Sequence, residues 1–337
     1  MYQLEMKKQE PQQQPQQPQH QKMPFISVCT PTFNRRPFFP YLIKSFYNQT
    51  YPTELIEWII IDDGTDPVED LVKDVPNVKY FYYETKMTLG KKRNIMHSKC
   101  KGDIIIYMDD DDYYPPTRIS HAVTELLNHP TKLIGGCSKL NIYFNKLDKI
   151  YEFGPYGENH ATAATFAFKK ELLDNAHYMD DKSIAEETGF LKNYTIPLIQ
   201  LDTSQTILVF SHDQNTFDKT ELLNQNPGSN PYVRVTNLSV SDFIKDNDLY
   251  TFYVKKLDTI LSQYEFGQKK HKPDVVIQSN EMIINRLRSQ LEQVLTENQQ
   301  LREDNTHLKS MNTYLTTKLK DYIQQEIKKR LEHNILP

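Results

Sequence analysis

The sequence predicts an α/β fold with a mostly parallel sheet flanked by helices, followed by a C-terminal α-helical coiled coil. Two observations support this prediction. From Phe25 to about Val235, short runs that are apolar throughout alternate with segments of helical spacing, which is typical of a parallel sheet covered on both faces. From about Val275 onward, Leu and similar residues recur every seven positions, as they do in a coiled coil.

Strands and helices alternate in the first part of the α/β region. Strands are expected where apolar and β-branched residues run together, at 25–30, 56–62, 78–84 and 103–108. Helices are expected between and after them, at 38–49, 68–74, 91–100 and 116–130. The last of these helices is expected to begin with a Thr cap at Thr117.

The pattern changes in the second part, where strands are expected to pair in antiparallel fashion. Antiparallel strands are expected at 139–144, 149–153 and 161–168. A helix-like segment then follows at 183–194, and strand-like runs follow at 197–202 and 206–211. An α/β half is therefore followed by a mixed half.

The chain is expected to divide into four segments. Residues 1–22 are dominated by Gln and Pro, which cannot bury enough apolar surface to fold, so a disordered tail is expected. Residues 23–235 form the α/β domain, and residues 236–274 form a helical extension that ends in the linker "FGQKKHKPD". Residues 275–337 form the coiled coil.

The heptad repeat predicts self-association through a parallel two-stranded coil. The d positions hold Leu or Val: Leu287, Val294, Leu301, Leu308 and Leu315. The a positions include three Asn residues: Ile284, Leu291, Asn298, Asn305, Asn312 and Leu319. Asn at a lowers stability but fixes the register. The alternative is a single helix that folds back on the globular domain.

Composition excludes several classes of protein. A net charge of −4 gives no basic surface for nucleic acid. Three widely spaced cysteines indicate neither a disulfide framework nor a zinc site, and reduced thiols fit a cytoplasmic location. No apolar run is long enough to cross a bilayer, and the N-terminus has no signal core, so neither a transmembrane segment nor a signal peptide is expected.

Polar motifs follow three of the predicted strands: "TPTFNRR", "DDGTD" and "MDDDD". Ligands of an open parallel sheet bind beyond the carboxyl ends of its strands, so these motifs are expected to meet. "DDGTD" is either a plain turn or a pair of carboxylates for a nucleobase or ribose. In "LGKKRN", Lys92 and Arg93 are candidates to pair with a diphosphate or with the aspartates; the alternative is a basic solvated helix face.

The four consecutive aspartates of 109–112 need a source of positive charge, because like charges raise one another's pKa. Side chains alternate at a strand end, which allows Asp109 and Asp111 to face one cavity. Mg²⁺ and Mn²⁺ prefer carboxylate oxygens, so a metal bound to a diphosphate is one interpretation. An acidic solvated loop is the other.

Together, "SVCTPTFNRR", "IIIDDGTD", "GKKRN", "DIIIYMDDDDYYPP" and "AEETGFL" resemble the family 2 glycosyltransferases in order and approximate spacing. The resemblance covers residues 25 to about 215, and the first strand and the Asp run are its specific parts. It implies a GT-A type, Rossmann-like fold. It also implies a hexosyltransferase that uses Mn²⁺ or Mg²⁺ to move a sugar from a nucleotide-sugar donor to an acceptor hydroxyl, with inversion.

The resemblance also implies roles for single residues. Those implied to bind the donor are Thr30, Pro31, Phe33, Asp62 or Asp63, Arg93 and Asp110. Those implied to lie at the metal are Asp109 and Asp111, which match the ends of the DxD motif, then Asp112 and the candidate His212. His160 is a weaker candidate on the acceptor side.

A general base is implied at the family's Glu-Asp pair, which matches Glu186 and Glu187, with Glu187 at the base position. Here Glu replaces the expected Asp, which shifts the acceptor geometry. The alternative is an exposed helix N-terminus, where Glu interacts well with the helix dipole. The acceptor is left open among a glycan, a lipid-linked sugar and a protein side chain.

Two rival functions remain. A nucleotidyltransferase would carry a Gly-rich loop after the first strand, where this chain has "TPTFNRR". A degenerate glycosyltransferase acting as a coiled-coil interaction protein is favoured by the altered acid pair and disfavoured by the intact Asp run. Every candidate site residue precedes residue 216, so the C-terminal segments are expected to lie outside the site.

Overall fold

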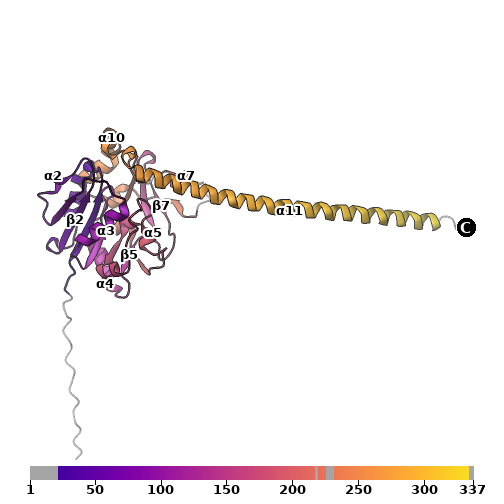
Figure 1. Ribbon diagram of the computed structural model, residues 1–337, viewed down its shortest axis with the longest axis horizontal. Coiled ribbons are helices and arrows are strands. Elements are labelled where there is room, and N and C mark those ends of the chain that lie inside the picture. Colours follow the sequence, from indigo (N-terminus) through magenta and orange to yellow (C-terminus); the bar gives the residue numbers. More distant parts are fainter. Residues whose placement is uncertain (1–21, 217–218, 225–230, 334–337) are drawn as a thin grey trace, which may run out of the picture. The chain divides into compact units, whose positions relative to one another are not determined.

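The computed structural model describes residues 22–216, 219–224 and 231–333 (Figure 1). The chain divides into two compact units, one ending at Val275 and the other beginning at Val276. The tail expected at residues 1–22 lies outside the described residues except for Lys22. The first unit holds two sheets and the helices that cover them.

Within the described residues, the larger sheet has seven strands in the order β3-β2-β1-β4-β8-β5-β9. They are β1 (Ile26–Thr32), β2 (Ile56–Asp62), β3 (Val78–Tyr82), β4 (Ile104–Tyr107), β5 (Ile134–Gly136), β8 (Ala167–Lys169) and β9 (Leu198–Gln200). Strand β8 is antiparallel to β4 and β5, and the other pairings are parallel. The predicted mostly parallel sheet is confirmed.

Strands β1, β2 and β4 are buried along their whole length, which accounts for their apolar sequences because both faces of the sheet are covered. Helices α1 (Phe39–Tyr47), α2 (Glu69–Val72) and α4 (Arg118–Asn128) pack on one face. Helices α3 (Leu89–Lys99) and α5 (Glu187–Phe190) pack on the other.

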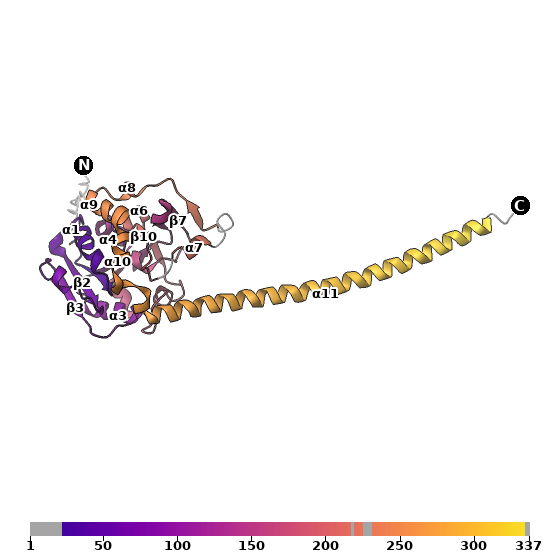
Figure 2. The same ribbon diagram turned by 90° about the horizontal axis from the view of Figure 1, so that it is seen from above.

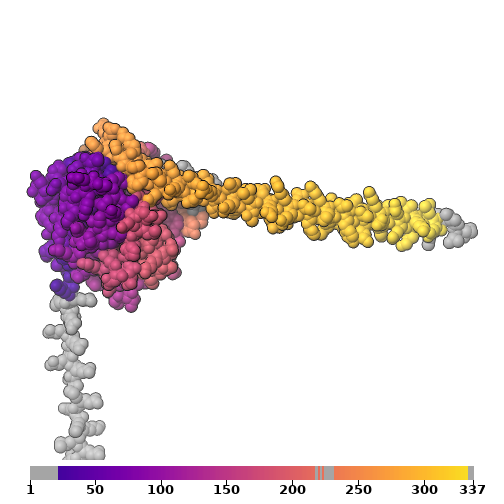
Figure 3. Space-filling model, in the orientation of Figure 1, coloured from indigo at the N-terminus to yellow at the C-terminus, as the bar shows by residue number. Residues whose placement is uncertain are grey.

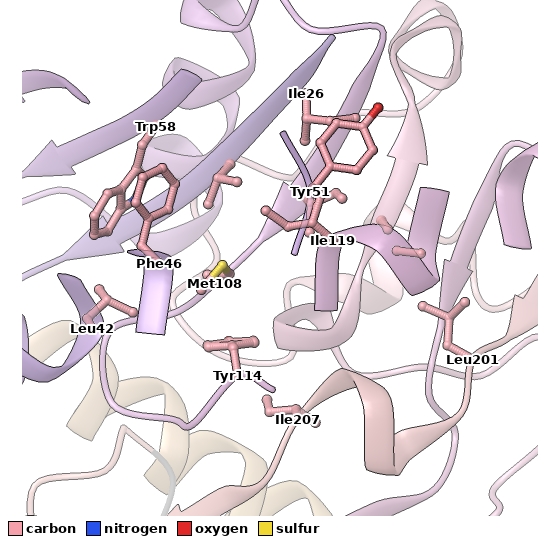
Figure 4. Close-up of a cluster of buried hydrophobic side chains, with 14 of the residues drawn as sticks. Ile26, Leu42, Phe46, Tyr51, Trp58, Met108, Tyr114, Ile119, Leu201 and Ile207 are labelled. Atoms are coloured by element: carbon pink, nitrogen blue, oxygen red, sulfur yellow. The ribbon is translucent and has the colours of Figure 1, made fainter. Parts of the chain in front are cut away.

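Alternate residues of β2 supply both cores. Trp58 and Ile60 belong to the cluster under α1, whereas Ile59 and Ile61 belong to the opposite cluster. Trp58 stacks on Phe46 of α1 with ring centroids 4.4 Å apart (Figure 4). This packing fixes β1 and β2 against α1 and holds their carboxyl ends in place.

Among the residues that the structure describes, the smaller sheet has four strands in the order β10-β6-β7-β11. They are β6 (Leu140–Phe144), β7 (Lys149–Phe153), β10 (Val209–Ser211) and β11 (Val233–Val235). The antiparallel pair expected at 139–144 and 149–153 is present as β6 and β7. The run at 206–211 became β10, which joins this sheet by pairing in parallel with β6.

Helical turns follow the smaller sheet and pack beside α1. They are α8 (Val240–Phe243), α9 (Asn247–Tyr250), the π-helical η6 (Thr251–Lys256), α10 (Leu257–Gln263), η7 (Glu265–Gly267) and η8 (Lys269–His271). Tyr41 of α1 stacks on Phe252, with ring centroids 3.6 Å apart, so segments some 200 residues apart in sequence lie side by side (Figures 2 and 3). The helical extension expected within 236–274 is therefore broken into short helices.

The remaining elements are short. They are α6 (Thr203–Thr206), α7 (Glu221–Asn224), η1 (Arg36–Phe38), η2 (Thr53–Leu55), η3 (Asn145–Leu147), η4 (Ala163–Thr165) and η5 (Lys170–Asp174). The long α11 spans Pro273–His333. No helix in the described ranges combines the length and apolar character that a membrane span requires.

One local expectation was wrong, and another was met in position only. The helix expected at 183–194 is only the four-residue α5, because Ala185 before it and Lys192, Asn193 and Tyr194 after it have positive φ, which an α-helix does not tolerate. Thr117 precedes α4 but makes no side-chain hydrogen bond to its first turn.

Candidate functional site

A cavity of about 110 Å³ lies at the carboxyl ends of β1 and β4. Its wall is highly charged. The acidic residues are Asp109, Asp110, Asp111 and Asp274, and the basic ones are Arg35, Lys86, Lys92 and Lys272. Pro31, Thr32, Phe33, Met87 and Leu89 supply much of the remaining surface. Charged groups of both signs at a strand edge indicate a site for an anionic ligand with a cation.

Two arginines separate the aspartates of the run. Asp109 accepts from Arg93, with its closer oxygen 3.1 Å from Nη2. Asp110 and Asp111 both face Arg35, at 3.5 and 3.2 Å. These guanidinium groups offset the repulsion between neighbouring aspartates that was expected from the sequence.

The carboxyl groups differ in pKa because their surroundings differ. Burial raises the pKa of Asp110 to about 7. Burial also opposes ionisation of Asp111, but Arg35 and His212 outweigh it and hold the pKa of this group well below its usual range. Burial and the neighbouring Asp111 raise the pKa of Asp112, whose carboxylate accepts from the backbone N–H of Phe210 at 3.3 Å. Of Asp110, Asp111 and Asp112, Asp111 is therefore the one whose surroundings favour the ionised form.

The four ligands expected from the sequence do not converge. Within the part of the chain that the structure describes, no group of three His, Cys, Asp or Glu side chains is arranged to hold a metal ion. Asp109 pairs with Arg93, and Asp112 bonds to the backbone of β10. Of the expected ligands Asp109, Asp111, Asp112 and His212, Asp111 and His212 lie close together, at 3.3 Å.

Asp111 and His212 do fit a divalent cation. The Oδ2 of Asp111 lies 3.3 Å from Nε2 of His212, and Asn215 contacts both groups. Burial lowers the pKa of His212 to about 4, so at neutral pH the ring is in the uncharged form that binds metals. Mg²⁺ is usually held by one or two carboxylates together with substrate phosphates, and Asp111 supplies one such carboxylate.

The residues expected at the nucleobase divide into two groups. Pro31 and Phe33 line the cavity, and the Phe33 ring lies 5.1 Å from Nζ of Lys86. Thr30 does not line it, because its hydroxyl donates to the carbonyl of Met108 at 2.6 Å and accepts from Trp58 at 2.9 Å. Thr30 therefore has a structural place between the strands.

Asp62 organises the loop after β2 rather than lining the cavity. It accepts hydrogen bonds from the N–H groups of Gly64 and Val68 and from the hydroxyl of Tyr80, at 2.8 to 3.0 Å. A Cβ at Gly64 would lie only 2.6 Å from the backbone N of Asn34, so the glycine lets the loops after β1 and β2 meet.

Asp63 lies one layer behind the cavity wall. Its carboxylate forms an ion pair with Lys92 and accepts from the N–H of Met87 at 2.6 Å. Lys92 and Met87 line the cavity, whereas Asp63 itself does not. Asp63 thus positions two wall residues.

Arg93 lies between the Asp run and the acid pair. It is fully buried, its Nε donates to Glu186 at 3.0 Å, and its guanidinium lies 4.4 Å from the Tyr107 ring centre. Burial raises the pKa of Glu186 despite this pairing. Arg93 therefore orients Asp109 and Glu186 and is not part of the cavity wall.

Glu187 has the free carboxylate of the acid pair. It begins α5 and is half-buried. Burial and the adjacent Glu186 raise its pKa to about 7, near the value at which a general base works best at neutral pH. No other described side chain donates a hydrogen bond to it, whereas Glu186 is held by Arg93.

His160 belongs to a row of aromatic rings. It stacks on Tyr194 at 4.8 Å and contacts Tyr156 at 5.0 Å, and Tyr156 contacts Tyr232 at 5.3 Å. The hydroxyl of Tyr194 lies 3.1 Å from that of Thr188, the residue after Glu187. Tyr156 and Tyr232 are 44% and 45% exposed and line a second cavity of about 900 Å³.

Two wall residues were missed in the sequence. Arg35 is the first arginine of "TPTFNRR", and its pairing with the Asp run depends on the fold. Lys272 lies in the segment interpreted as a linker, yet it is only 5% exposed and lines the cavity. The basic run "KKHK" before Pro273 was the only available signal, and such runs are usually solvated.

Comparisons with known proteins show which family the domain resembles. Residues 27–179 match the family model Glycosyl transferase family 2. The chain is 24% identical over 260 residues to an uncharacterized glycosyltransferase of Haemophilus influenzae, a match that covers 72% of this chain and 94% of that protein. It is 33% identical over 191 residues to the GalNAc(5)-diNAcBac-PP-undecaprenol beta-1,3-glucosyltransferase of Campylobacter jejuni, covering 51% and 60%. The chain thus spans less than two thirds of the Campylobacter protein.

Solved structures of glycosyltransferases also match. The mannosyltransferase PcManGT from Pyrobaculum calidifontis, in complex with GDP-Man and Mn²⁺, has a TM-score of 0.46 at 17% identity, covering 62% of this chain and 66% of that chain. TarS of Staphylococcus aureus, in complex with UDP-GlcNAc, has a TM-score of 0.41 at 18% identity, covering 55% and 58%. On the family match, residues 27–179 form a glycosyltransferase family 2 domain, and the chain ends in the long helix α11.

Proposed function

We propose that the domain transfers a sugar from a nucleotide-sugar donor with inversion, in a reaction assisted by a divalent cation, to a hydroxyl of a glycan acceptor. The observation that carries this proposal is the double contact of Arg93, which bonds to Asp109 at the donor cavity and to Glu186 beside Glu187. One buried guanidinium thereby links the aspartates of 109–112 to the pair Glu186 and Glu187. Direct displacement requires the bound donor and the general base to be held close together.

Asp111 and His212 are the proposed metal-holding residues, with Arg35 orienting Asp111. A divalent cation bound to this pair supplies positive charge that stabilises the departing diphosphate. Arg35 and Lys92 add fixed cations to the same wall, and Phe33 offers an apolar face for the nucleobase.

Glu187 is the proposed general base. Its carboxylate takes the proton from the acceptor hydroxyl while the acceptor oxygen attacks the anomeric carbon from the side opposite the diphosphate. A pKa near 7 leaves a substantial ionised fraction at neutral pH and makes the group basic enough to accept the proton. Glu186 is a positioning residue, because its carboxylate is engaged by Arg93.

The aromatic row supports a glycan as the acceptor. Exposed tyrosine rings offer flat apolar faces, with polar edges, to sugar rings. The row runs from Tyr232 and Tyr156 at the larger cavity to Tyr194, which contacts Thr188 next to the proposed base. A relative that acts on a glycan joined to undecaprenol, as its name states, agrees with this acceptor class.

Release of nucleoside diphosphate tests the proposal. The full chain is incubated with UDP-Glc, UDP-GlcNAc, UDP-GalNAc and GDP-Man, each with Mn²⁺, with Mg²⁺ or with EDTA. We expect at least one donor to release its diphosphate slowly by hydrolysis, in a metal-dependent manner. Pyrophosphate release from nucleoside triphosphate and sugar phosphate would instead identify a nucleotidyltransferase, and inactivity in both assays would favour a degenerate enzyme.

We also propose that α11 associates with a second copy of the chain as a parallel coiled coil. Its d-position side chains Leu287, Leu301, Leu308 and Leu315 are 54 to 65% exposed. Leucines this exposed on one stripe of a helix require a partner, since isolated polar helices are only marginally stable. Self-association is thus the proposed role of the heptads, and it is separate from the chemistry.

A further inference from the structure

The segment Tyr264–Val275, here called the strap, closes one side of the donor cavity. The hydroxyl of Tyr264 donates to Asp66 at 2.8 Å. Gln214 donates to the carbonyl of Tyr264 at 2.8 Å, and Asn34 donates to the carbonyl of Phe266 at 3.0 Å. The strap is therefore tied to the loops that follow β1, β2 and β10.

The C-terminal end of the strap is fixed inside the cavity wall. Asp274 forms an ion pair with Lys86 at 2.5 Å and accepts from the hydroxyl of Ser183 at 2.5 Å. Lys272, Asp274 and Val275 all line the cavity. A segment that sequence analysis assigned to a linker thus builds part of the donor site.

Lys272 is a buried lysine whose ammonium group contacts no partner directly among the described residues. It is 5% exposed, and among the described residues its ammonium makes no hydrogen bond and lies within ion-pair distance of no carboxylate. Burial and the nearby Arg35 guanidinium lower its pKa. Buried charges are normally paired, because an isolated one is costly to remove from water.

The nearby carboxylates are already engaged by other cations. Arg35 is paired with Asp110 and Asp111, and Lys92 is paired with Asp63. Asp110 and Asp111 attract Lys272 only from beyond ion-pair distance. The cavity therefore presents Arg35, Lys92 and Lys272 on its wall, and of these three, Lys272 is the one that no acidic side chain of the described residues contacts directly.

We propose that Lys272 binds the diphosphate of the nucleotide-sugar donor, so that the strap completes the donor site. The proposal rests on the proposed function. In the transfer step the acceptor oxygen forms a bond to the anomeric carbon, Glu187 takes the acceptor proton, and the bond from that carbon to the diphosphate breaks. The electron pair leaves with the nucleoside diphosphate, and Lys272 faces the charge that develops there.

The donor cavity is small compared with typical ligand sites. Sites for ligands of this size usually enclose about 300 to 1,000 Å³, whereas this cavity encloses about 110 Å³.

Calorimetric titration of the full chain with UDP, GDP and inorganic pyrophosphate, in the presence of Mn²⁺, tests the proposal. We expect Lys272→Gln to weaken binding of the nucleoside diphosphate at least about tenfold, as for a lost hydrogen bond to a charged group. Lys272→Arg should retain most of the affinity. The matched control is Lys270→Gln, since Lys270 is exposed and pairs with Glu265 at 2.5 Å; it should bind like the wild type.

The outcomes distinguish a failure of the proposed function from a failure of the proposed role of Lys272. If the wild type binds neither UDP nor GDP, the proposed function fails before Lys272 is tested. If the wild type binds and Lys272→Gln binds equally well, the role of Lys272 is refuted while the function stands. Thermal melting tests whether Lys272 has a purely structural role. A lowered Tm for Lys272→Gln with unchanged diphosphate affinity would mean that the lysine stabilises the Asp run. Weakened affinity with the Tm maintained supports the proposal.

Discussion

The Nε of Arg93 lies 3.0 Å from the carboxylate of Glu186, and the same guanidinium reaches Asp109 at 3.1 Å. Arg93 comes from α3, Asp109 follows β4, and Glu186 precedes α5. The cation is fully buried and lies against the Tyr107 ring. This arrangement sets the position of Glu186, and through the chain it sets the position of Glu187.

Removing this cation is expected to cost both stability and activity. Arg93→Met leaves Glu186 buried without its partner, and breaking a buried ion pair from one side costs about 3 to 5 kcal/mol. Chemical denaturation should show this loss. The double variant Arg93→Met, Glu186→Gln should recover part of the stability but none of the transfer activity. Full recovery of activity would contradict a positioning role for Arg93.

Glu187→Gln is expected to lose most transfer activity while binding UDP or GDP as the wild type does, because the base acts on the acceptor. In the wild type, the rate should rise with pH through about 7, since the pKa of Glu187 is raised to about 7 and only the ionised form accepts a proton. Rate measurements from pH 5.5 to 8.5 check this. If Glu186→Gln abolishes turnover and Glu187→Gln does not, the base assignment is off by one residue.

The metal proposal predicts that Asp111→Asn and His212→Ala both lose metal-dependent hydrolysis of the donor. EDTA should inactivate the wild type, and Mn²⁺ or Mg²⁺ should restore it. Asp112→Asn should be milder in the same assay, because this carboxylate already accepts a hydrogen bond from the backbone N–H of Phe210. Unchanged activity of Asp111→Asn, or full activity in EDTA, would refute the metal site.

The aromatic row predicts a separation of acceptor and donor effects. Tyr156→Ala should raise the KM for a glycan acceptor at least several-fold, with the rate of donor hydrolysis unchanged. Tyr82→Ala is the matched control, since Tyr82 is equally exposed but lies on β3. Equal KM values for the two variants would remove the aromatic row from acceptor binding.

The coiled coil predicts a dimer whose loss leaves chemistry intact. Sedimentation of the full chain at micromolar concentration should give a dimer, and the double variant Leu301→Glu, Leu308→Glu should be monomeric, because charge at d positions opposes a buried seam. A monomeric wild type would exclude the dimer.

Two truncations distinguish the contribution of the coiled-coil part of α11 from that of the strap. A chain that ends after Ser279 keeps the strap and should retain donor hydrolysis, whereas one that ends after Lys270 should lose it, because Lys272, Asp274 and Val275 line the cavity. This second expectation replaces the view from sequence that nothing after residue 216 contributes to the site. Full activity after truncation at Lys270 would restore that view.

Local sequence was sufficient for the elements of the α/β half. Apolar β-branched runs become buried strands because only a covered sheet hides both faces of such a run, and β1, β2 and β4 follow this rule. The motifs at the strand ends could be located for the same reason, since parallel strands bring their carboxyl ends to one edge. The heptads likewise predicted one long helix, α11.

Tertiary structure decided which polar groups meet. Whether Asp62 contacts a ligand or its own loop depends on Tyr80 and Val68, and whether Asp109 holds a metal or Arg93 depends on α3. Lys272 became a wall residue only because the chain returns to the first strand loop after more than 200 residues. The periodicity of apolar residues indicates which side of a helix or strand is buried. It carries no information on which distant charge lies opposite, because ion pairs and hydrogen bonds act over a few ångströms that only the folded chain defines.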